Sequence, residues 1–176
     1  TKDTLPGYSG RAITSISIDP NDPDHVLVTL GNFNNTRYIY RSTNATSSNA
    51  AFNSRQGTGG NRLPYMPVYA SLIPMNNSNM AIVGTEFGIY TTDNISAANP
   101  TWTPYGGTGD MVDVPVVTLL QQTYNFPYTF YVQGEGISQV VTEYPATSNY
   151  GVIYAGTHGR GAFRSLDFVG MEEPEK

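Results

Sequence analysis

Short apolar segments alternate with turns rich in Gly, Pro and Asn along most of the chain, and one order of segments occurs three times. Each unit begins with an apolar strand, turns into a second apolar strand that ends in Gly, and closes with an aromatic-containing strand. That last strand ends in Ser or Thr, with Asn or Asp two residues later, at residues 38–44, 88–94 and 161–167. Short strands separated by turn residues predict an antiparallel β-fold.

Two further matches tie the second and third units together. Pro67-Val68 recurs as Pro115-Val116, and Gly84-Thr85 recurs as Gly156-Thr157. A period of ~40–50 residues is that of one four-stranded blade of a β-propeller. We therefore expect an all-β chain of about three blades, that is, a partial propeller. The predicted parts are a lead-in segment (1–10), blades at approximately 11–62, 63–110 and 111–168, and an acidic linker or tail (169–176).

The strands of the second unit indicate how the blades pack. The segment between Pro67 and Pro74 is apolar on both faces, as expected for the inner strand of a blade sandwiched between neighbours. Residues 101–105 predict the outer strand, because Pro104 is tolerated on a sheet edge. A closed propeller has at least four blades, and three alone would expose two large apolar faces. We expect the remaining blades to come from the same or another chain.

Composition and charge narrow the classes of partner. Only 13% of the 176 residues are charged, the net charge is −5, and there is no Cys. A nucleic-acid partner is not expected, because counterion displacement needs a basic stripe and the nine basic residues are scattered. No apolar run reaches the ~20 residues of a membrane span. An Asn-, Ser- and Thr-rich, Cys-free chain favours a secreted bacterial protein.

The polar ends of the three units resemble the Asp-box, Ser-x-Asp-x-Gly-x-x-Trp, of the BNR (bacterial neuraminidase repeat) propellers, which include sortilin- and xyloglucanase-like proteins. Asn replaces Asp twice, the Gly is absent, and Trp102 is displaced by an insertion. The residues that match are Ser42 and Asn44, Thr92 and Asn94, and Ser165 and Asp167.

The resemblance extends to exported surface proteins of Bacteroidetes, in which a segment like residues 155–164 often precedes a linker and a sorting domain. It implies export by a type IX-like route and display at the cell surface. The acidic, Pro-containing tail fits such a linker.

Candidate chemistry is sparse. A glycosidase needs two carboxylates facing each other across a cleft, whereas Asp19, Asp22 and Asp24 lie together in one turn and favour turn capping. They could offer oxygens to Ca²⁺, but they lack the ligand spacing of an established calcium loop. His25 is expected on the surface. We therefore predict no catalytic residue, no resident metal and no cofactor.

Two groups of residues are candidates for binding. Glu86 and His158 occupy equivalent places in the Gly-Thr-x turns, and His158 with Arg160 could bind a carboxylate or a sugar hydroxyl; the favoured interpretation of residues 159–161 is a tight turn with a solvated Arg. Residues 121–150 form an insertion with a predicted hairpin. Its aromatic residues would either stack on sugars and partner proteins or pack over a blade. Those named as candidates are Tyr124, Tyr128 and Phe130.

Three functions stay open. The first is a non-catalytic module that binds glycans or proteins, or serves assembly, at the bacterial surface. The second is the C-terminal part of a sialidase- or xyloglucanase-like glycoside hydrolase whose catalytic residues lie mostly upstream. The third is a purely architectural segment of a large exported protein.

Overall fold

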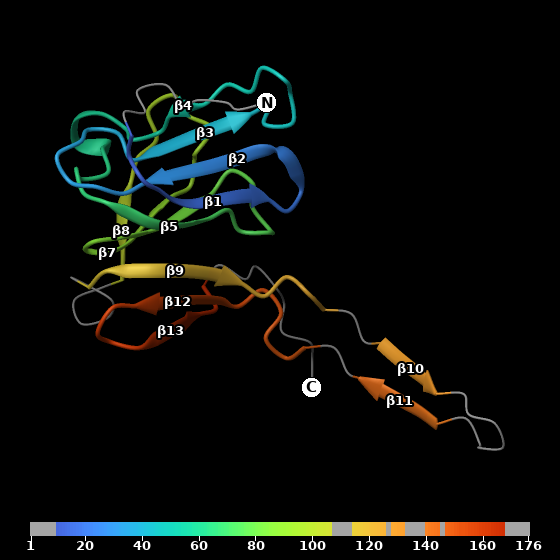
Figure 1. The fold of residues 1–176 in the computed structure, drawn as a ribbon. Helices are drawn as coiled ribbons and strands as arrows, with labels where there is room; N and C mark the ends of the chain where they lie inside the picture. Colours follow the sequence, from blue (N-terminus) through green and yellow to red (C-terminus); the bar gives the residue numbers. More distant parts are fainter. Residues whose placement is uncertain (1–9, 107–113, 126–127, 133–139, 145–146, 168–176) are drawn as a thin grey trace.

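The protein is all-β, with three antiparallel sheets and a separate hairpin (Figure 1). The computed structural model describes residues 10–106, 114–125, 128–132, 140–144 and 147–167. A single turn of 3₁₀ helix, η1 (Gly59–Asn61), is the one helical element of this described part. The predicted all-β class is confirmed, and the three sheets fall within the three predicted blades.

Sheet 1 and sheet 2 are four-stranded meanders in which each strand pairs with the next one in sequence. This order follows from the short turns, because antiparallel neighbours need only a few connecting residues. The strands of sheet 1 are β1 (Ile13–Asp19), β2 (Asp22–Leu30), β3 (Ile39–Thr43) and β4 (Asn53–Ser54). Those of sheet 2 are β5 (Val68–Leu72), β6 (Ala81–Thr85), β7 (Gly88–Thr92) and β8 (Thr103–Tyr105).

Sheet 3 has three strands in the described residues, where the repeat predicts four. Its order is β13-β12-β9, so the second strand of the unit again lies in the middle. The predicted hairpin insertion separates β9 from β12 in sequence and forms its own two-stranded sheet. The strands of sheet 3 are β9 (Val116–Gln121), β12 (Ile153–Thr157) and β13 (Ala162–Ser165); those of the hairpin are β10 (Tyr128–Val132) and β11 (Val140–Tyr144).

The three sheets stack face to face, with their first strands side by side (Figure 1). Between β1 and β5 the contact is polar: the Ser17 hydroxyl lies 2.6 Å from the Ser71 carbonyl and 2.8 Å from its hydroxyl. Between sheets 2 and 3 the contact is steric. A Cβ at Gly84 would lie 2.5 Å from the Val116 carbonyl oxygen, so only Gly allows this approach.

Sheet 2 is buried on both faces because it lies between the other two. Side chains alternate along β6: Ala81 and Val83 join the core of the interface between sheets 1 and 2, whereas Ile82 joins the core between sheets 2 and 3. In β5 a register irregularity follows Val68, so Val68 and Ala70 reach opposite cores. The two-faced burial predicted for this strand is confirmed.

The described residues do not close a ring, and the first strands of sheets 1 and 3 carry exposed apolar side chains. On β1, Ile16 and Ile18 are 61% and 60% exposed; on β9, Leu120 is 63% exposed. Apolar side chains are therefore exposed on the first strands of sheets 1 and 3. In the described part of the chain, no helix is long and apolar enough to cross a membrane.

Candidate functional site

The three Asp-box-like ends share one turn geometry. In each, the Ser or Thr oxygen accepts a hydrogen bond from the backbone N–H two residues later, a local bond that turns the chain out of the sheet. The N–H groups are those of Asn44, Asn94 and Asp167, which lie 3.2, 3.4 and 3.1 Å from Ser42, Thr92 and Ser165 respectively. This geometry assigns the motif residues a structural part in each repeat.

The third residue of the motif holds the following loop in the first two units. The Asn44 side-chain oxygen accepts the N–H of Ala51 at 2.9 Å, and that of Asn94 accepts the N–H of Ala97 at 3.0 Å. In the third unit the corresponding Asp167 carboxylate accepts a hydrogen bond from the Tyr105 hydroxyl of sheet 2. Here the motif therefore connects two sheets.

The Gly-Thr turns of sheets 2 and 3 are also built alike. The Thr85 hydroxyl donates to the Gly88 carbonyl at 2.8 Å, and the Thr157 hydroxyl donates to the Gly161 carbonyl at 2.7 Å. Both acceptor glycines have positive φ, 83° and 78°, a conformation that favours Gly. Gly156, which precedes Thr157 in β12, has room for a larger residue. A Cβ added there would lie 3.4 Å from its nearest neighbour, Thr118 Cβ, which is an ordinary contact distance.

Glu86 and His158 occupy equivalent positions, as the sequence predicts. Each donates its backbone N–H to the Pro carbonyl just before its own sheet, at 3.2 Å to Pro67 and 2.9 Å to Pro115. Both turns lie at one end of the stacked sheets (Figure 1). Arg160 is exposed in the same turn as His158.

Glu86 has a specific partner in its own sheet. The Tyr69 hydroxyl donates a hydrogen bond to the Glu86 carboxylate. Burial and then this carboxylate raise the pKa of Tyr69 to about 12, so the phenol stays protonated at neutral pH. Among the described residues, no hydrogen bond or ion pair joins Glu86 to His158 or Arg160, so these candidates lie at one end of the sheets without forming a single site.

The hairpin candidates lie apart from this end. Tyr124 precedes β10 and is 53% exposed; its carbonyl accepts a hydrogen bond from the Thr147 hydroxyl at 2.9 Å. Tyr128 and Phe130 lie in β10, opposite Tyr144 and Thr142 of β11. The side chains of Tyr128 and Phe130 lie outside the described part of the structure.

A hydrogen-bonded row of three polar side chains in sheet 1, Asp19, His25 and Arg41, was not predicted from the sequence. His25, expected on the surface, is 3% exposed: its Nδ1 lies 3.0 Å from the Asp19 carboxylate, and Arg41 donates Nε–H to its Nε2 at 2.8 Å. The expectation for His25 is wrong because the strand β3 places Arg41 over it across the sheet. The local sequence around His25 does not indicate which residues of β3 will lie beside it.

This row holds His25 neutral. Burial lowers the pKa of His25, the nearby Arg41 lowers it further, and the hydrogen bond with Asp19 opposes both. Burial acts to raise the pKa of Asp19, but bonds from the Asn21 N–H, Ser78 and His25 outweigh it and lower that pKa. The bond from Asn21, 2.8 Å long, confirms that Asp19 caps the turn.

The other carboxylates of this turn are also used locally. Asp24 accepts the Thr46 N–H at 2.8 Å and the Thr46 hydroxyl at 2.6 Å, and these bonds lower its pKa. Asp22 accepts the N–H of Asp24 at 3.0 Å. Within the described ranges, no group of three or more His, Asp or Glu side chains is placed to hold a metal ion.

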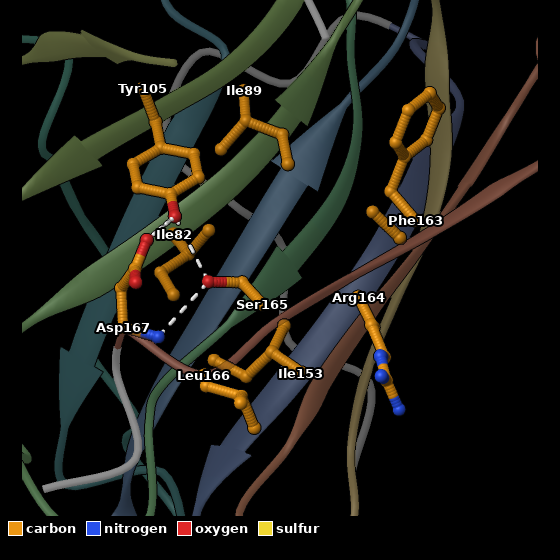
Figure 2. A pocket seen from close by; sticks show the side chains of 10 residues that line it. Ile82, Ile89, Tyr105, Ile153, Phe163, Arg164, Ser165, Leu166 and Asp167 are labelled. Carbon is orange, nitrogen blue, oxygen red and sulfur yellow. Dashed lines mark hydrogen bonds between the residues drawn. The ribbon is translucent and has the colours of Figure 1, made fainter. Parts of the chain in front are cut away.

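A cavity of 410 Å³ lies between sheets 2 and 3 (Figure 2). Its walls are mainly apolar, and its polar end is formed by Tyr105, whose hydroxyl lies 2.9 Å from that of Ser165 and also bonds Asp167. The apolar side chains that line it are Ile82, Ile89, Ile153, Ala155, Phe163 and Leu166.

The interface between sheets 1 and 2 is filled at the corresponding place. Trp102, 4% exposed, packs into that core, and its indole N–H donates to the Arg55 carbonyl at 2.8 Å. Trp102 precedes β8, whose described bounds begin at Thr103, although the sequence places it within the outer strand. Sequence reasoning counted Trp102 as a motif residue but did not locate the cavity.

Neither a protein-family model nor a curated protein matches this chain.

Proposed function

We propose that the chain is a non-catalytic β-propeller module of a secreted or cell-surface bacterial protein, which binds glycan or protein partners or serves assembly. The observation that carries this proposal is that five carboxylates of the described residues are used within the fold. Each of these five forms hydrogen bonds with neighbouring backbone or side chains. These carboxylates are Asp19, Asp22, Asp24, Glu86 and Asp167.

Such carboxylates are poorly suited to glycoside hydrolysis. The reaction needs one carboxylic acid and one carboxylate roughly 5–10 Å apart on either side of the scissile bond. Here three of the five lie in or beside one turn of sheet 1, and the other two belong to different sheets. A hydrolase would require its catalytic pair from carboxylates other than these five.

The Gly-Thr turn end is our candidate binding surface. It carries a carboxylate at Glu86, an exposed imidazole at His158 and an exposed guanidinium at Arg160. Such donors and acceptors on adjacent turns suit a ligand rich in hydroxyl groups. The resemblance to Asp-box propellers supports bacterial export and surface display as part of the same proposal.

A glycan array probed with the 176-residue chain tests this function. We expect retention of at least one class of glycan, with about tenfold weaker binding by a Glu86→Gln, Arg160→Ala double variant. Asp22→Asn is the matched control, because it changes an exposed carboxylate at the opposite end of the sheets (Figure 1).

The same preparation is incubated with sialosides and xyloglucan oligosaccharides, and released sugar is measured. Hydrolysis by the chain would contradict the non-catalytic proposal. Absence of binding to any glycan would contradict the glycan-binding form of this proposal and favour protein binding, assembly or the architectural alternative.

A further inference from the structure

The outer edge of sheet 3 differs from the outer edges of its neighbours. In sheets 1 and 2 the third strand pairs with a fourth, β3 with β4 and β7 with β8. The third strand of sheet 3, β13, pairs with β12 on one side and with no other strand of the described residues. An edge of this kind is a template for another extended chain.

The register of the fourth strands shows which side chain precedes each of them in sheets 1 and 2. Arg41 of β3 lies opposite Asn53, and Thr91 of β7 lies opposite Thr103. The residue just before the fourth-strand partner is therefore Phe52 in sheet 1 and Trp102 in sheet 2. Both positions are aromatic.

Both aromatic side chains pack on the same face of their own sheet. Phe52 packs against the cluster that contains Val28 and Tyr40, and Trp102 packs in the cluster that contains Val83 and is contacted by Tyr90. Val28 and Val83 pair with Tyr40 and Tyr90 respectively, so the two clusters occupy equivalent positions. In sheet 3 the equivalent pair is Ala155 and Phe163.

The equivalent place in sheet 3 is the cavity described above. Ala155 and Phe163 line it, together with Ile82 and Ile89 from sheet 2 (Figure 2). In the interface between sheets 1 and 2, the Trp102 indole occupies this position and bonds the carbonyl of Arg55, the residue after β4. The cavity therefore lies at the place that an aromatic side chain fills in the neighbouring interface. It lies beside the edge of β13 that is unpaired in the described residues.

We propose that the cavity between sheets 2 and 3 binds the tryptophan side chain of an extended partner segment, which adds to β13 as a fourth strand. The segment's backbone would pair with the edge, and its indole would fill the apolar volume. Its ring N–H would point toward the polar end formed by Tyr105, Ser165 and Asp167. This site is independent of glycan binding at the Gly-Thr turn end.

The occupant is a partner segment and not a second copy of these 176 residues. The chain contains one Trp, and Trp102 is already 4% exposed in its own interface. A second copy would have to open its sheet 2 to donate it. That would uncover the largest aromatic residue of its core.

The probe is a fluorescently labelled peptide with the sequence of residues 99–106, the segment that fills the equivalent place in sheet 2. Its binding to the 176-residue chain is followed by fluorescence anisotropy. We expect saturable binding, at least about tenfold weaker for the peptide in which Trp is replaced by Ala. No binding at peptide concentrations up to ~1 mM would overturn the proposal.

Two protein variants locate the site. Ala155→Leu adds carbon atoms within the 410 Å³ cavity, which has room for them, and should weaken binding about tenfold. Ala51→Leu makes the same change at an exposed position and should leave binding intact. Circular dichroism confirms folding of both variants. Equal affinity for the two variants, or for the Trp and Ala peptides, would overturn the proposal.

Size-exclusion chromatography of the chain without peptide measures its oligomeric state and so tests whether a second copy occupies the cavity. A monomer that binds the peptide supports the partner segment. A dimer that dissociates when the peptide is added, and that Ala155→Leu also abolishes, would instead identify a second copy as the occupant.

Discussion

The interface between sheets 1 and 2 and the interface between sheets 2 and 3 join sheets whose first three strands have the same order, yet they are filled differently. Between sheets 1 and 2, Leu27, Ile39, Val83 and Ile95 are fully buried around Trp102. Between sheets 2 and 3, the equivalent volume is a cavity of 410 Å³. Similar strand pairing therefore does not ensure similar packing; the difference is a single aromatic residue, Trp102, just before the fourth strand of sheet 2.

The inner strands differ as well. Sheets 1 and 2 are joined by hydroxyl contacts of Ser17 and Ser71 and by a bond from the Asn21 side chain to the Met75 carbonyl at 2.9 Å. Sheets 2 and 3 meet where Gly84 lies against Val116. The Met75 N–H also donates to the Gln121 side-chain oxygen of sheet 3 at 2.8 Å, so the two interfaces differ in this close approach and not in having side-chain bonds.

Loss of the indole should produce the largest effect on this comparison. Trp102→Ala leaves a cavity between sheets 1 and 2 like that between sheets 2 and 3, and should lower the free energy of unfolding by about 3–5 kcal/mol. Urea unfolding followed by circular dichroism measures it. Phe163→Ala, at a partly buried position beside the existing cavity, is the matched control and should cost less. Equal losses would contradict the difference between the interfaces.

A methyl group at the close contact should have the next largest effect. Gly84→Ala places its Cβ 2.5 Å from the Val116 carbonyl oxygen, so the backbone of sheet 3 must shift, at a cost of about 1–3 kcal/mol in unfolding free energy. Gly156→Ala is the control, since its added Cβ meets the nearest atom at 3.4 Å. If both variants unfold at the same urea concentration, the close approach does not govern this interface.

Lowering the pH should produce the smallest effect on the free energy of unfolding, and the groups responsible lie in sheet 1. The folded pKa of His25 is lowered, so the unfolded chain binds the proton first, at its ordinary pKa of about 6.5. Stability is therefore complete above that pH and falls below it, by up to about 1.4 kcal/mol per pH unit. The lowered pKa of Asp19 adds a further loss only nearer pH 4.

Unfolding in urea between pH 7 and pH 5 measures this dependence. His25→Gln should flatten it, whereas His158→Gln, which changes the chain's other His at an exposed turn, should leave it unchanged. Hydrogen exchange should show the acid-induced loss of protection first in β1 and β2 and not in β12. A slope that persists in His25→Gln would assign the effect to other groups.

Much of the candidate site was predictable because it lies in turns. The Gly-Thr turns and the Asp-box-like ends depend on bonds between residues two to four apart, such as Thr85 with Gly88, so their local sequence specifies them. The hairpin followed from alternating residues around its turn. By contrast, the burial of His25 depends on Arg41, and the cavity depends on Tyr105 and Ser165, residues that are distant in sequence.

The order of strands, the repeat of about three units and the turn chemistry were determined by the sequence itself, because alternation, Gly and Pro act over a few neighbouring residues. Only the tertiary structure decided that sheet 3 has an open edge in the described residues, that Trp102 fills one interface, and that a cavity lies at the equivalent place among the described residues of the other. Those facts depend on which faces of the sheets meet. Side chains from different repeats come into contact only in the interfaces between stacked sheets.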